Sequence, residues 1–147
     1  MSDVEGYKEL YAKLARFRGA IQKKAQDFIL RLMKKQIDMI LARTRKGVEI
    51  DGGAFKPYSP SYAARKSKIN PNYPDWLRMT GFMLNSMVVR LIRANTGEVL
   101  FGSARARELM SYNDATRPFF GVNRDEHSDL EIYYAKLLFQ EVKNVFG

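Results

Sequence analysis

The chain has 147 residues, of which 46% are apolar, and a formal net charge of +9 at pH 7. This length and composition predict one domain, or one domain with an arm, and argue against intrinsic disorder. The absence of cysteine excludes disulfides and thiolate metal sites, and the single histidine, His127, leaves little room for histidine-based catalysis or zinc binding. The chain has no run of 18 apolar residues and no signal-peptide pattern, so we expect no membrane partner and no secretion.

The positive charge is concentrated at the N-terminal end. Residues 1–46 carry 12 Lys or Arg against 5 Asp or Glu, residues 47–122 have a balance of +4, and residues 123–147 a balance of −2. This asymmetry favours an anionic partner, or neighbouring copies that meet head to tail. The alternative is that a long exposed helix uses Lys and Arg only for solubility.

Residues 5–45 have the apolar periodicity of one helix, with Gly19 as its weakest position. A helix of this length would span about 60 Å at 1.5 Å per residue. A compact domain of this size has a radius of gyration of only about 15 Å. The helix must therefore break near Gly19, or project and need another chain to cover its apolar stripe. We predict a basic N-terminal helical segment over residues 1–46, followed by a domain over residues 47–147.

Between residues 47 and 87, turn residues alternate with short helices. Gly47 is expected to end the first helix, residues 51–53 form a glycine turn, and Ser59 caps a helix that begins at Pro60. Pro71 and Pro74 predict a non-regular crossing over residues 68–75, and Thr80 is expected to cap another short helix.

The second half of the chain predicts a hairpin between strands 87–94 and 98–103, the clearest one in the sequence. A short helix over 104–110, a polar loop over 111–116, an extended segment over 117–122 and an amphipathic helix over 129–146 follow. The order predicts an α+β fold: a long N-terminal helix, a small and mainly antiparallel sheet, and a C-terminal amphipathic helix.

No nucleophile stands beside a general base and no phosphate loop is present, so we expect a protein that is not an enzyme and binds no cofactor. His127 lies among Asp125, Glu126 and Asp129, which we interpret as a solvated helix start rather than a metal site. Tyrosines and Trp76 interleave with Lys and Arg over residues 56–76, a weak signal for single-stranded nucleic acid.

Two sets of residues are candidate contacts. Loops carry binding more often than regular elements do, and aromatic residues are enriched in interfaces, so the first set is predicted to bind a partner: Gly52, Gly53, Phe55, Tyr73, Trp76, Phe119 and Phe120. Core packing is the competing interpretation of the two phenylalanines. The second set is predicted to face DNA without sequence specificity: Lys23, Lys34, Lys35, Arg105, Arg107 and Lys24.

Four blocks in order, over residues 53–59, 77–87, 98–103 and 117–122, resemble the virion-morphogenesis and tail-completion proteins of tailed bacteriophages. The family's glycine–aromatic–proline opening, its Leu-x-x-Thr-Gly core, its strand ending in Gly-Ser and its Arg-Pro-Phe segment match these positions: Pro57, Ser59, Leu77, Thr80, Gly81, Leu84, Ser86, Gly102, Arg117 and Pro118. Between the last two blocks the chain has Tyr112 but neither the histidine nor the glycine that family members often carry.

The resemblance implies a structural protein of the head–tail interface in the virion, assembled in the host cytoplasm. It implies a ring, commonly of six copies, that completes or terminates the tail and joins the tail tube to the connector of the neck. The alternative from the residues alone is a monomeric, basic nucleic-acid-binding module.

Overall fold

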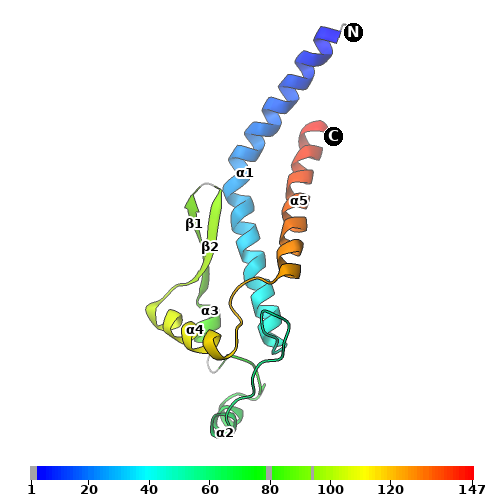
Figure 1. Cartoon of the computed structure of the whole chain (residues 1–147). Helices are drawn as coiled ribbons and strands as arrows, with labels where there is room; N and C mark the ends of the chain where they lie inside the picture. Colours follow the sequence, from blue (N-terminus) through cyan, green and yellow to red (C-terminus); the bar gives the residue numbers. More distant parts are fainter. Residues whose placement is uncertain (1–2, 79–80, 94) are drawn as a thin grey trace.

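The fold is α+β, as predicted, in a computed structural model that describes residues 3–78, 81–93 and 95–147 (Figure 1). Its elements are a long helix α1 (Asp3–Arg45), helix α2 (Pro60–Ile69), a short α3 (Phe82–Asn85), strands β1 (Met87–Arg93) and β2 (Thr96–Phe101), and helices α4 (Ala104–Thr116) and α5 (Arg124–Phe146). The two strands form one antiparallel sheet in which Met87 pairs with Phe101.

Helix α1 is continuous and organises the molecule, because α5 packs along one side of it and the hairpin along the other (Figure 1). Gly19 does not interrupt it, so the projecting alternative is the one observed. Its first turns extend past the end of α5, while α2 lies at the opposite end of the molecule (Figure 1). The helix ends at Arg45, and Gly47, with φ of 68°, donates its amide to the Thr44 carbonyl at 2.9 Å.

The prediction of a loop over 111–116 is wrong, because α4 continues to Thr116. The polar residues there stabilise the helix and its end: the Asn113 side chain donates to the Leu109 carbonyl at 2.7 Å. Asp114 accepts from the amides of Phe119 and Phe120, each at 3.0 Å. The apolar periodicity of the sequence does not reveal hydrogen bonds between side chains and the backbone.

Residues 117–122, predicted to be extended, instead form a loop with bends at residues 117, 120 and 121. They form no strand in the described part of the chain, and their carbonyls bind other partners. The Pro118 carbonyl accepts from the Ile50 amide at 2.8 Å. Helix α5 begins at Arg124, five residues earlier than predicted, because Asn123 and Glu126 form a capping box. Thr80, the predicted cap of α3, lies outside the described residues, and Gly81 with φ of 84° occupies the N-cap position.

One apolar core joins α1, the loop before α2, α3, the hairpin, α4 and the 117–122 segment. Its buried members are contributed by nearly every element: Ile40, Phe55, Leu77, Met83, Leu84, Met87, Phe101, Ala106 and Phe119. The ring of Phe101 lies 6.4 Å from that of Phe119 and 5.1 Å from that of Phe120. The hairpin also packs closely on α1, since a Cβ on Gly97 would stand 2.8 Å from Ile29 Cγ2.

We expect Gly47→Ala to destabilise the fold much more than Gly52→Ala. Both glycines have positive φ, 68° and 95°, so each substitution incurs about 1–2 kcal/mol of backbone strain. A Cβ at Gly47 would also lie 2.3 Å from Trp76 Nε1, whereas a Cβ at Gly52 meets nothing within 4 Å. The displaced indole should add about 1–3 kcal/mol for Gly47 alone. Urea unfolding of both variants measures the difference, and equal losses would contradict the contact.

Candidate functional site

Helix α2 and its flanking loops, residues 56–78, form an arm at the end of the molecule opposite the chain termini (Figure 1). Its base is held by a cluster of Tyr58, Lys66, Trp76 and Arg117, which we call the clamp. The centre of the Trp76 ring lies 5.0 Å from that of the Tyr58 ring. Two cations lie over the Tyr58 ring: the Arg117 guanidinium is 4.4 Å and the Lys66 ammonium 4.6 Å from its centre. The clamp therefore places two cations against one aromatic ring.

Hydrogen bonds satisfy the polar groups of the clamp. The Tyr58 hydroxyl accepts from Lys66 Nζ at 3.1 Å and from the Leu77 amide at 2.8 Å, and Lys66 also donates to the Asp75 carbonyl at 2.6 Å. Arg117 reaches the start of the arm, where it donates to the carbonyls of Lys56 at 2.6 Å and Pro57 at 3.0 Å. These hydrogen bonds hold the two ends of the arm together and attach the arm to Arg117.

The side chain of Lys66 is fully buried, and this burial lowers its pKa to about 8, with the Asp75 carboxylate opposing the shift and Arg117 reinforcing it. Burial likewise raises the pKa of Tyr58, because it disfavours the phenolate. In the clamp, burial therefore favours the neutral form of both Lys66 and Tyr58.

We predict that the free energy of unfolding rises between pH 8 and about 10 and then falls. In that window the unfolded chain keeps the Lys66 proton that the folded chain releases, so stability increases with pH. The pKa shift corresponds to about 3 kcal/mol in full. Above about pH 10 the unfolded Tyr58 ionises while the folded one stays neutral, which reverses the slope.

Urea unfolding from pH 7 to 11 tests this with Lys66→Met, which should abolish the rise between pH 8 and 10. Lys68→Met, on the exposed face of the same helix, is the matched control and should keep it. If Lys66→Met keeps the rise in full, the titration belongs to another group.

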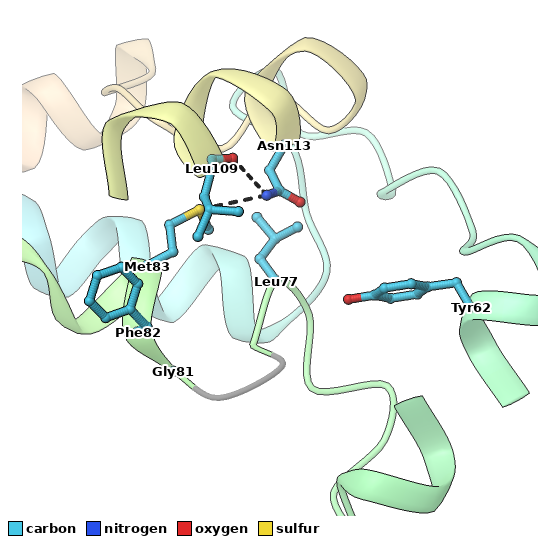
Figure 2. Close-up of a pocket in the computed structure, with 7 residues that line it drawn as sticks. All are labelled: Tyr62, Leu77, Gly81, Phe82, Met83, Leu109 and Asn113. Carbon is cyan, nitrogen blue, oxygen red and sulfur yellow. Dashed lines mark hydrogen bonds between the residues drawn. The ribbon is translucent and has the colours of Figure 1, made fainter. Parts of the chain in front are cut away.

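A hollow of about 110 Å³ lies between the arm and α4 (Figure 2). Tyr62 approaches it from α2, Leu109 and Asn113 from α4, and Leu77 from the end of the arm, with Gly81, Phe82 and Met83 completing the wall. Asn113 Nδ2 is held by the Leu109 carbonyl and by Met83 Sδ at 3.7 Å. The volume corresponds to a few water molecules, so we interpret the hollow as the seam along which the arm meets the body.

The structure divides the predicted partner-binding residues into buried, half-buried and exposed groups. Phe55 and Phe119 are core residues, 4% and 0% exposed, so their side chains are not accessible to a partner in the folded subunit. Trp76 and Phe120 are half-buried, Trp76 against Phe55 and Tyr58, and Phe120 against Phe101. The exposed residues of the set are Gly52, Gly53 and Tyr73, at the tip of one loop and on the arm.

The predicted DNA-facing residues also divide. Lys24 binds the buried Glu141 of α5 at 2.6 Å, Arg105 binds Glu108 at 2.8 Å, and Arg107 donates to the Phe101 carbonyl at 3.1 Å. Lys35 lies 5.8 Å from the centre of the Tyr133 ring. Lys23 and Lys34 are exposed and form no ion pair with the described residues. Part of the basic helix therefore pairs with the acidic C-terminal region inside the same chain.

A row of exposed apolar side chains follows the first turns of α1. We call residues 4–16 the extension. Its apolar side chains are largely uncovered: Val4 is 62% exposed, Tyr7 64%, Leu10 48%, Tyr11 73% and Leu14 46%. Cover from α5 begins with Phe17, whose ring lies 6.0 Å from that of Phe146. The extension thus continues the stripe that α5 covers further along.

At the acidic start of α5, Glu126 is paired with Arg43 at 3.2 Å. Across the described residues, no group of three or more His, Asp and Glu could hold a metal ion. No described helix is long and apolar enough to cross a membrane.

Comparisons with protein-family models, with curated proteins and with solved structures found no match.

Sequence reasoning identified the stripe on α1 but missed the roles of the buried cations. Lys66 and Tyr58 belonged to the pattern interpreted as a nucleic-acid signal, yet they bind each other. Arg43 stands in the last turn of α1, where basic residues are usually solvated, yet it is 7% exposed. No spacing in the sequence distinguishes such a residue from an exposed one.

Proposed function

We propose that the protein is a structural subunit of the head–tail interface of a tailed bacteriophage. The observation that carries this proposal is the extension, a helix that leaves its own domain with an exposed apolar stripe. An apolar stripe of this kind on a soluble chain marks a protein interaction site. The molecule is therefore best understood as one unit of an assembly.

The four sequence blocks that resemble tail-completion proteins support this proposal, because their described residues meet in one place. Phe55 from the first block, Leu77 and Leu84 from the second, Phe101 from the third and Phe119 from the fourth are all buried in the common core. The four blocks, although far apart in the chain, therefore contribute to one core.

In the proposed role the subunit is not an enzyme. It forms a homo-oligomeric ring, six copies by the resemblance, as a tail-completion or tail-terminator protein in the virion. Its neighbours are the connector or neck proteins on one side and the tail tube on the other, and DNA passes through the lumen. Gly52, Gly53 and Tyr73, on exposed loops, are the proposed contacts to those neighbours.

We expect deletion of residues 1–14 to impair assembly while leaving the fold intact. These residues precede Phe17, whose packing on Phe146 the deletion preserves. Circular dichroism and urea unfolding should match those of the full chain, whereas analytical ultracentrifugation should show loss of the oligomer. A truncated chain that unfolds, or one that still assembles fully, would contradict the proposal.

The alternative, a monomeric nucleic-acid-binding module, relied partly on the aromatic residues of the arm. Tyr58 and Trp76 pack on each other at 5.0 Å, and the two cations of the clamp lie over the Tyr58 ring, so these aromatic rings do not form a stacking platform for bases. What remains of this alternative is the basic surface of α1, which a lumen facing DNA would also use.

We predict that Lys23→Glu with Lys34→Glu lowers DNA affinity without preventing ring assembly. Two lost phosphate contacts should reduce the slope of log K against log salt by about 2. Lys68→Glu with Arg93→Glu changes the net charge equally on exposed sites elsewhere and is the control. Titration of fluorescent duplex DNA at several salt concentrations gives the slopes.

An equal change in both pairs would indicate attraction by net charge alone and would contradict the proposed DNA-facing surface. If the α1 pair instead abolishes the ring, and reversal of acidic residues in α5 restores it, these lysines belong to an interface between subunits.

A further inference from the structure

A second exposed apolar stripe runs along the outer face of α5. This helix faces α1 through Leu130, Tyr134 and Glu141, of which Leu130 and Glu141 are buried and Tyr134 packs edge-on to Phe28 at 6.4 Å. On another face, Ile132 is 54% and Phe139 59% exposed, with Ala135 exposed between them and Val142 half-buried beyond. We call these four residues the outer stripe.

The outer stripe and the extension have the same spacing. Val4, Tyr7, Tyr11 and Leu14 are separated by three, four and three residues, and so are the four positions of the outer stripe. This alternation keeps one seam of a helix facing a partner helix. Two helices with matching seams can pack side by side over about 15 Å, at 1.5 Å per residue.

An antiparallel arrangement suits both the sizes and the charges of the two stripes. It places Leu14 beside Ile132 and Tyr7 beside Phe139, and it gives the large Tyr11 the small Ala135 as neighbour. Residues 13–18 carry +3 and lie along the acidic start of α5, where Asp125, Asp129 and Glu131 are exposed.

In the other half of the seam the charges are reversed, with the negative charge on the extension and the positive charge on α5. Residues 4–9 have a net charge of −1 and lie along the part of α5 that carries the exposed Lys136 and Lys143. The pairing also repeats the antiparallel sense in which α1 and α5 already pack within one chain (Figure 1).

The two stripes do not meet within one subunit, because the first turns of α1 project past the end of α5 (Figure 1). We propose that the extension of one copy docks on the outer stripe of a second copy of this chain. The contact joins two different surfaces, so it is heterologous and leaves each copy with one free extension and one free outer stripe. Repetition closes a ring when the rotation allows it. This inference rests on the proposed role as a repeating subunit and names the contact that builds the repeat.

Disulfide cross-linking tests the contact, because the chain has no cysteine of its own. Tyr7→Cys in one protein and Phe139→Cys in a second, size-tagged protein are mixed and oxidised. We expect disulfides between the two variants in at least tenfold excess over disulfides between like variants. Glu9→Cys, on another face of the same helix, replaces Tyr7→Cys as the matched control and should give no excess.

A second measurement does not depend on cysteine chemistry. Phe139→Lys and Tyr11→Lys should each weaken self-association at least about tenfold, as expected for aromatic anchors of an interface, while circular dichroism stays unchanged. Both positions are exposed in the subunit, at 59% and 73%, so the fold does not depend on them.

The outcomes separate this inference from the proposed function. Oligomers that form without the Tyr7–Phe139 cross-link, and that Phe139→Lys leaves intact, overturn the contact but keep the ring. Disulfides confined to Tyr7→Cys with itself show that the extension pairs with another extension, which also overturns it. A chain that stays monomeric at all concentrations overturns both.

Discussion

The buried guanidinium of Arg43 fixes how the two halves of the molecule meet. It donates to the carbonyls of Phe119 at 2.9 Å and Gly121 at 2.8 Å, and forms two bonds of 3.2 Å to the carboxylate of Glu126. A buried charge is tolerated only when its hydrogen bonds and its countercharge are both supplied. Because Glu126 also accepts from the Asn123 amide at 3.1 Å, the same carboxylate caps α5. The end of α1, the 117–122 segment and the start of α5 are thereby held in one arrangement.

Arg117 works in the same way on the other side of that segment. Its bonds to the carbonyls of Lys56 and Pro57 join the segment to the arm, so two arginines hold a stretch that pairs with no strand among the described residues. The carbonyls of Phe119 and Gly121 bind the Arg43 side chain, and that of Pro118 binds the Ile50 amide. The arm in turn depends on the clamp, because Lys66 is the buried residue of α2.

The predictable parts of the fold are those that local sequence determines. The stripe of α1, the Ser59 cap before Pro60 and the hairpin follow from spacing, capping chemistry and β-branched residues, and each is present. The 117–122 segment was not predictable, because Arg43 lies 76 residues from Phe119 along the chain. For the candidate site, the exposed stripe was inferable from helix length, but the burial of Lys66 was not. Lysine is almost never fully buried unless it is paired. The sequence around residue 66 does not indicate which groups pair with this lysine.

The extension contributes little to the folding of its own chain, and its side chains are available for the proposed assembly. The buried apolar side chains in the described part of α1 are Phe28 and Ile40, far along the helix from Val4 and Tyr11. The side chains of the extension are about half to three-quarters exposed, so the monomer gains little from them. A helix as short as the extension is marginal in water on its own, and here the remainder of α1 nucleates it. In the proposed assembly, the chain presents a preformed helix to its neighbour, so association need not include the entropic cost of forming that helix.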